Sequence, residues 1–166
     1  MIVKICIVVV FCILYWLMCY LGTGGDEKNI KSFRSYPDEV KEIVKKDEML
    51  SGKIPGPVNM TKVFLSNVIL FAVVFLVIGV ILRFTVGFRN FVEALIYFVA
   101  FGQIINLFDL LVIDLMWWRN SPRIRFSCAK EKSLYKNPKP HVASFARGIA
   151  MFLIPSVIAA GIVSLF

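Results

Sequence analysis

Three long runs of this sequence contain no charged residue: residues 5–21, 63–82 and 148–166. Each has roughly the 20 apolar residues that an α-helix needs to cross the hydrocarbon core of a bilayer. In water, the Val, Ile and Phe content of residues 63–82 would favour a strand. In lipid the backbone must satisfy its own hydrogen bonds, so the same run is expected to be a helix.

A fourth run, residues 90–118, is also long and apolar, although it contains Glu93, Asp109 and Asp114. Of the 166 residues, 58% are hydrophobic and 18% are charged, whereas soluble domains have about 25% charged residues. We therefore expect an all-α, polytopic membrane protein with four transmembrane helices and one membrane domain, residues 1–166. The expected helices are residues 5–21, 63–82, 90–118 and 145–166.

The first run could instead be a secretory signal peptide, because Lys4 precedes it. Signal peptides end in small residues of the Ala-x-Ala kind, and here the corresponding stretch is YWLMCYLG. Tyr15, Trp16 and Tyr20 are typical of the aromatic belt at a membrane interface. The sequence favours a retained transmembrane helix.

Lys and Arg predict the orientation. Residues 22–62 hold eight of them and residues 119–147 hold eight, whereas the opposite side has only Lys4, Arg83 and Arg89. Because positive loops stay in the cytoplasm, we expect cytoplasmic loops at residues 22–62 and 119–144, and both termini outside the plasma membrane. The net charge of +8 then belongs to loops that meet anionic lipid, and no motif points to nucleic acid.

Each cytoplasmic loop has one notable feature. In SYPDEVKEIVKKDEML, Pro37 and the acids after it predict the start of a short amphipathic helix. This helix could lie on the membrane, pack on the bundle or be a solvated connector. In the second loop Arg119, Arg123 and Arg125 lie beside the membrane, where each charge contributes about 1 kcal/mol to binding anionic lipid headgroups.

Polar side chains within the third helix predict an intramembrane cluster. A carboxylate near the bilayer centre costs at least about 2.5 kcal/mol, so it needs a partner, water or a proton. The fourth helix enters from the same side and would bring Arg147 near Asp114. On an α-helix, the five-residue spacing of Asp109 and Asp114 does not place them side by side. The predicted cluster is Asn67, Gln103, Asn106, Asp109, Asp114 and Arg147.

Two function classes fit this cluster. The first is a non-enzymatic component of a small transporter or channel, or a partner subunit, in which the cluster either binds something or only fixes helix packing. The second is a membrane-embedded enzyme acting on lipid. No catalytic residue, metal ligand set or cofactor is predicted, because His141 is the only histidine and no CxxC motif exists. Either class allows a homo-oligomer or a membrane partner.

The segments SYPDEVKEIVKKD, NLFDLLVIDLMWWRNSPRIRF and KNPKPHVASFARGI together resemble a family of small bacterial integral membrane proteins without an established activity. That family has a Tyr-Pro-x-Glu-Val segment, an Asp-x4-Asp helix that ends in aromatic residues, a basic loop and a last helix. Where the family has Gly-Thr-Glu-Asp, this chain reads SCAKEK. The resemblance marks Tyr36, Pro37, Val40, Asp109, Asp114, Trp117, Arg119, Arg123, Arg125 and His141.

Overall fold

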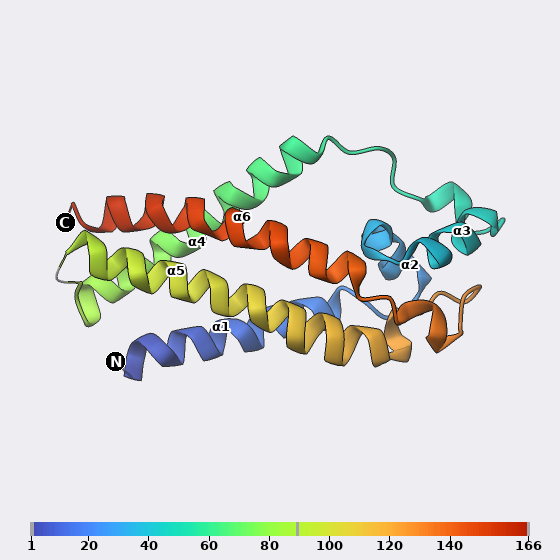
Figure 1. Cartoon of the computed structure of the whole chain (residues 1–166), viewed down its shortest axis with the longest axis horizontal. Coiled ribbons are helices and arrows are strands. Elements are labelled where there is room, and N and C mark those ends of the chain that lie inside the picture. The colour runs from blue at the N-terminus through green and yellow to red at the C-terminus, as the bar shows by residue number, and fades with distance from the viewer. Residues whose placement is uncertain (1, 89, 166) are drawn as a thin grey trace. The chain divides into compact units, whose positions relative to one another are not determined.

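The computed structural model describes residues 2–88 and 90–165, and four of its helical stretches are long and apolar enough to cross a membrane (Figure 1). The predicted all-α fold with four membrane-spanning helices is confirmed, and the chain is a multi-pass membrane protein. Arg89, counted above for orientation, and Phe166, the predicted end of the fourth helix, lie outside the described residues. The elements are α1 (Ile2–Leu21), α2 (Asp26–Asn29), η1 (Ile30–Ser35), α3 (Asp38–Lys46), η2 (Ser51–Lys53), α4 (Met60–Thr85), α5 (Phe91–Phe108), η3 (Asp109–Trp117), η4 (Trp118–Asn120), η5 (Pro122–Ile124), η6 (Lys132–Tyr135) and α6 (Lys139–Val163).

The chain divides into two compact units. The first unit consists of Met1–Phe11, Val58–Leu107 and Phe145–Phe166, and the second consists of Cys12–Pro57 and Phe108–Ser144. The single membrane domain expected above stays a prediction.

The first unit is held together by aromatic side chains from its long helices. Phe75 of α4 is fully buried, and its ring centroid lies 5.6 Å from that of Phe98 and 5.3 Å from that of Phe101, both in α5. Phe152 of α6 packs on the same ring, and Phe11 of α1 packs on Phe101. Lipid is as apolar as these rings, so close van der Waals contact, rather than escape from water, stabilises the unit.

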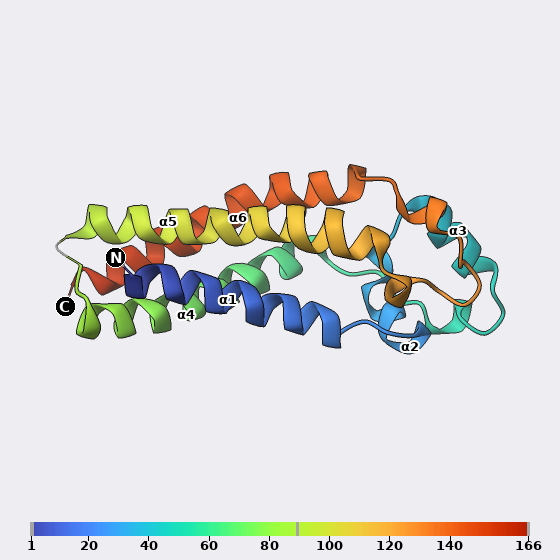
Figure 2. The same cartoon turned by 90° about the horizontal axis from the view of Figure 1, so that it is seen from below.

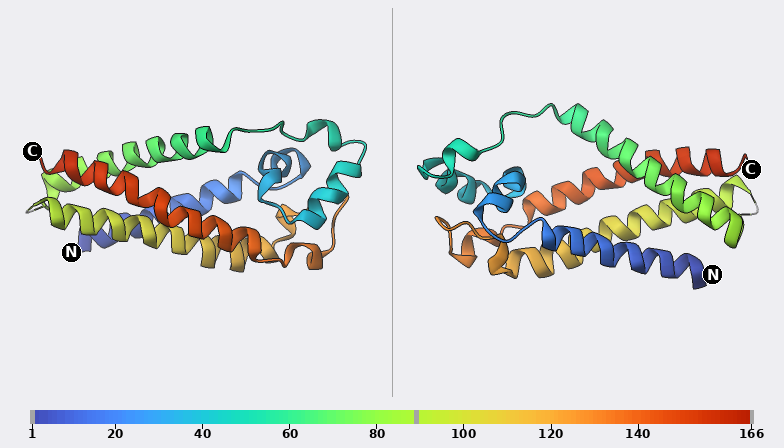
Figure 3. Two further views of the ribbon diagram at one scale, coloured as in Figure 1. Left: turned by 45° about the horizontal axis from the view of Figure 1, so that its top comes forward. Right: turned by 180° about the vertical axis from the view of Figure 1, so that it is seen from behind.

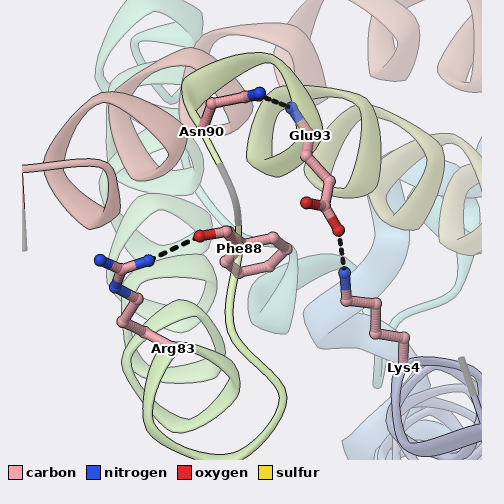
Figure 4. A network of polar contacts seen from close by, with 5 residues as sticks. All are labelled: Lys4, Arg83, Phe88, Asn90 and Glu93. Carbon is pink, nitrogen blue, oxygen red and sulfur yellow. Dashed lines mark hydrogen bonds and ion pairs between the residues drawn. The ribbon is translucent and has the colours of Figure 1, made fainter.

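One end of this unit gathers the beginning of α1, the turn between α4 and α5, and the end of α6 (Figure 2). Polar contacts link the elements at this end (Figure 4). Lys4 Nζ lies 2.8 Å from Glu93 Oε1 and 4.5 Å from the Phe88 ring centroid. The Arg83 guanidinium donates to the Phe88 carbonyl, and Asn90 Oδ1 accepts the Glu93 N–H at the start of α5. These contacts tie α1 to α5 and shape the turn.

Gly79 allows the closest approach between helices of the first unit. A Cβ atom there would lie 2.5 Å from Val163 Cγ2 and 2.9 Å from Phe98 Cζ. Gly79→Ala is therefore expected to lower the free energy of unfolding by about 1–3 kcal/mol through overpacking, measured in detergent by thermal unfolding.

Gly161→Ala is the matched control, because no heavy atom lies within 4 Å of the added Cβ. An equal loss of stability in both variants would mean that the close contact at Gly79 is not what matters. As small residues, Ser156, Ala160 and Gly161 predict close contact between helices. Ser156 and Ala160 are fully buried. The prediction is wrong for Gly161, because no heavy atom lies within 4 Å of an added Cβ there.

The second unit contains two segments, residues 22–57 and 118–138, that we together call the cap (Figure 3). The cap has a hydrophobic core of its own. The predicted amphipathic helix is α3, and its apolar stripe is buried inside this core, with Val40 and Val44 fully covered. The core residues are Ile30, Phe33, Tyr36, Val40, Val44, Leu50, Trp118, Ile124, Phe126, Ala129 and Tyr135. The two loops expected from the sequence therefore fold together as one structure.

Buried polar groups fix the register of the two cap segments. The Tyr36 hydroxyl donates to the Ile124 carbonyl at 2.8 Å, and Asn29 Nδ2 donates to the Arg123 carbonyl at 3.1 Å. Burial raises the pKa of the Tyr36 hydroxyl well above its usual value, so this group remains a donor at any physiological pH. Each bond joins residues about 90 positions apart, which makes the cap a tertiary structure and not a pair of local turns.

Candidate functional site

A π-helix carries the two intramembrane aspartates of the second unit. The segment η3, Asp109–Trp117, is π-helical, so its backbone bonds join residues five apart instead of four. Residues five apart then stack on one face, which brings Asp109 and Asp114 together and close enough for their carboxyl groups to interact electrostatically. The expectation that this spacing separates them is wrong, because it assumed α-helical geometry.

Asp114 is paired with His141. The His141 Nδ1 atom lies 3.0 Å from Asp114 Oδ2, and the His141 residue is only 4% exposed. The Trp118 ring packs against the imidazole with a centroid distance of 4.9 Å. His141 Nε2 is buried and has no hydrogen-bond partner among residues 2–88 and 90–165.

His141 reaches this position because α6 begins at Lys139, several residues before the predicted start at residue 145. Pro140 does not prevent this, since the N–H groups of a first helical turn have no partner within the helix. The sequence predicts that His141 lies outside the membrane span, and the predicted cluster therefore does not include it. Pro138 and Pro140, which precede His141, are the sequence signal for an earlier helix start. An earlier start would have placed His141 in the predicted cluster.

Asp109 faces α1. The Tyr15 hydroxyl lies within hydrogen-bonding reach of the Asp109 carboxyl group, and Cys19, one turn further along α1, interacts electrostatically with both aspartates. The sequence assigned Tyr15 to an interfacial aromatic belt. In the structure its hydroxyl also interacts with the carboxyl group of Asp109.

Gln103 and Asn106 have a different role from the aspartates. In the first unit, Asn106 Nδ2 donates to the Phe145 carbonyl at 3.1 Å and Gln103 Nε2 donates to the Ile149 carbonyl at 3.2 Å. Gly148, which has no Cβ, lets the Asn106 amide approach α6. These two amides bind backbone groups of α6, which is helix packing rather than a ligand site.

Asn67 and Arg147 also belong to the first unit. Asn67 of α4 is half-buried, and Arg147 of α6 is exposed. Among the described residues, neither side chain forms a hydrogen bond or an ion pair with another residue. The pairing of Arg147 with Asp114 stays a prediction, and the partner that the second unit provides for Asp114 is His141.

The three arginines predicted to bind lipid headgroups all bind backbone carbonyls of the second unit. The Arg123 guanidinium lies 4.1 Å from the Tyr20 ring centroid and donates through Nε to the Tyr20 carbonyl. Arg119 donates to the Lys136 carbonyl, and Arg125 donates to the carbonyls of Lys130 and Asn120. They hold the second cap segment to α1 and to itself.

The chemistry of the second unit is therefore that of a proton donor and acceptor set: two carboxyl groups, an imidazole and a phenol. Among residues 2–88 and 90–165, no group of three or more His, Cys, Asp or Glu side chains is arranged to hold a metal ion. We call Tyr15, Asp109, Asp114 and His141 the acid–imidazole site.

Comparisons with family models, with curated proteins and with solved structures give no match for this chain.

Proposed function

We propose that the chain is a component of a membrane transporter or channel, and that the acid–imidazole site is where it binds the transported or coupling ion. The observation that supports this most is the Asp114–His141 pair at 3.0 Å, which joins two helical stretches that are each apolar enough to cross a membrane. Ionisable groups at such a depth are costly, and they mark ion pathways and proton relays in membrane proteins.

The proposal includes an orientation. The cap lies in the cytoplasm and both termini lie outside the plasma membrane, because sixteen of the 19 Lys and Arg residues are in residues 22–62 and 119–147. The acid–imidazole site then opens toward the cytoplasmic side. Anionic lipid headgroups are proposed partners of the lysines and arginines of the second cap segment, and a second copy or another subunit could complete the pathway.

Ion flux through liposomes tests the proposal. The reconstituted chain is expected to increase proton or alkali-cation flux over empty liposomes, and Asp109→Asn is expected to reduce that flux at least tenfold by removing a charge from the site. The matched control is Asp38→Asn, the same chemical change at a cap carboxylate whose side chain is 95% exposed.

If the wild-type chain and Asp109→Asn are equally silent while Asp109→Asn loses thermal stability, the site serves packing and the transport proposal is wrong. Equal, measurable flux in both chains would also contradict a role for Asp109.

One observation favours the second candidate, an enzyme acting on lipid. An imidazole oriented by a carboxylate through one nitrogen, with the other nitrogen unpartnered among the described residues, is the arrangement of a general base. Analysis of lipid products in the same liposomes tests it. New products that disappear in His141→Gln would establish the enzyme in place of the transporter.

A further inference from the structure

We propose that the species handled by the acid–imidazole site is the proton, which enters at His141 Nε2 and passes through Asp114 to Asp109. This inference rests on the proposed transport function and names its substrate. It is supported by three features of the second unit: the short His141–Asp114 contact, the unpartnered ring nitrogen and the π-helical backbone.

Each carboxyl group has a neighbour that can carry a proton. His141 Nδ1 lies 3.0 Å from Asp114 Oδ2, and the Tyr15 hydroxyl interacts with the Asp109 carboxyl group. A hard cation such as Ca²⁺ requires about six to eight oxygen ligands. An imidazole and a phenol beside two carboxyl groups suit instead a site where protons move between heavy atoms.

His141 provides the entry point. A neutral imidazole has one N–H and one lone pair. In the proposed relay the N–H is at Nδ1, the nitrogen nearer to Asp114, and the lone pair is on Nε2. That atom is buried and lacks a partner among the described residues, which makes it a proton acceptor with no competing donor. The titratable groups that face the two carboxyl groups are Tyr15 and Cys19 from α1 and His141 from α6.

The transfer is balanced as follows. A proton that binds Nε2 converts the imidazole to imidazolium, and the Nδ1 proton moves to Asp114 Oδ2 across the 3.0 Å that separates the two atoms. The products are a neutral carboxylic acid at Asp114 and a neutral imidazole with its proton on Nε2. Asp114 then delivers the proton to the carboxylate of Asp109. The imidazole resets by giving the Nε2 proton to a water molecule and taking an Nδ1 proton from another, so that its proton count is unchanged.

The π-helix makes the last transfer possible. Asp109 and Asp114 lie on one face only because η3 bonds residues five apart. On an α-helix the second carboxyl group would point away from the first. π-Helical segments are frequent at functional sites, and here the segment coincides with both intramembrane aspartates.

Two measurements on the full chain test the inference. In liposomes containing a pH-sensitive dye, a potassium gradient with valinomycin should drive proton flux through the wild type, and His141→Gln should reduce it at least tenfold. Sodium flux is measured in parallel on the same preparations. Because His141 is the only histidine, ¹⁵N-histidine NMR of the detergent-solubilised wild type observes it directly. The neutral ring should carry its proton on Nδ1, and Nε2 should become protonated as the pH falls.

The outcomes separate this inference from the proposed function. Sodium flux without proton flux would keep the transport function and overturn the proton inference. The same inference is overturned if His141→Gln conducts protons as the wild type does, or if the neutral ring carries its proton on Nε2. An absence of flux for every ion would overturn both proposals. The NMR measurement uses only the wild type, so it tests the proton inference even if the His141→Gln variant fails to fold.

Discussion

Asp114→Val is expected to lower the free energy of unfolding by about 3 kcal/mol, because it removes one partner of a buried pair and leaves the other without compensation. His141 Nδ1 loses the carboxylate oxygen that lies 3.0 Å away, and because the residue is only 4% exposed, bulk water cannot replace that oxygen. Denaturant unfolding in detergent measures the loss. The variant is also expected to lose the ion flux of the wild type, since the relay loses its middle member.

The double variant Asp114→Val/His141→Leu separates packing from function. Replacing both members of a buried pair by apolar residues is often neutral or stabilising, so this variant is expected to recover most of the lost stability. Flux should remain absent, because the entry group and the middle member of the relay are both missing. Recovery of stability and flux together would show that the pair serves only to join η3 to α6.

Phe126→Ala is expected to unfold the cap while the membrane helices remain. Phe126 is fully buried, and its ring centroid lies 4.8 Å from that of Tyr36 in the other cap segment. Truncating a buried Phe costs about 3–5 kcal/mol, which is a large share of the stability available to a core as small as that of the cap.

Limited trypsin digestion measures this effect, because the cap contains most of the Lys and Arg residues of the chain. Phe126→Ala is expected to be cleaved at least tenfold faster than the wild type. Met49→Ala is the control, as Met49 is an apolar cap residue that is 81% exposed. Equal cleavage rates in all three proteins would mean that the two segments do not share a core.

The membrane helices were predictable because the signal is local. An uncharged run of about 20 residues must form a helix in lipid whatever its neighbours are. The runs at residues 5–21 and 63–82 accordingly became α1 and α4, each a few residues longer. The start of α6 was misplaced because charged residues such as Lys139 and Arg147 extend the helix beyond its apolar run.

The candidate site was predictable in part. Asp109 and Asp114 stand out in the sequence because carboxylates are rare in an apolar span. They were grouped with Gln103 and Asn106 because a rotation of about 100° per residue along an α-helix places these side chains near one face. In the structure those two amides instead bind the backbone of α6. The π-helical geometry of η3 has no signal in the residue types, so the facing of the two carboxyl groups was missed.

By itself, the sequence determined that four helices are able to cross a membrane and that the third contains two carboxylates, since both follow from hydrophobic length and residue identity. Only the tertiary structure decided that Asp114 meets His141, that Tyr15 meets Asp109 and that Tyr36 joins two distant loops in one core. The physical reason is that these pairings depend on backbone register and on contacts between residues far apart in the chain, which no local pattern encodes.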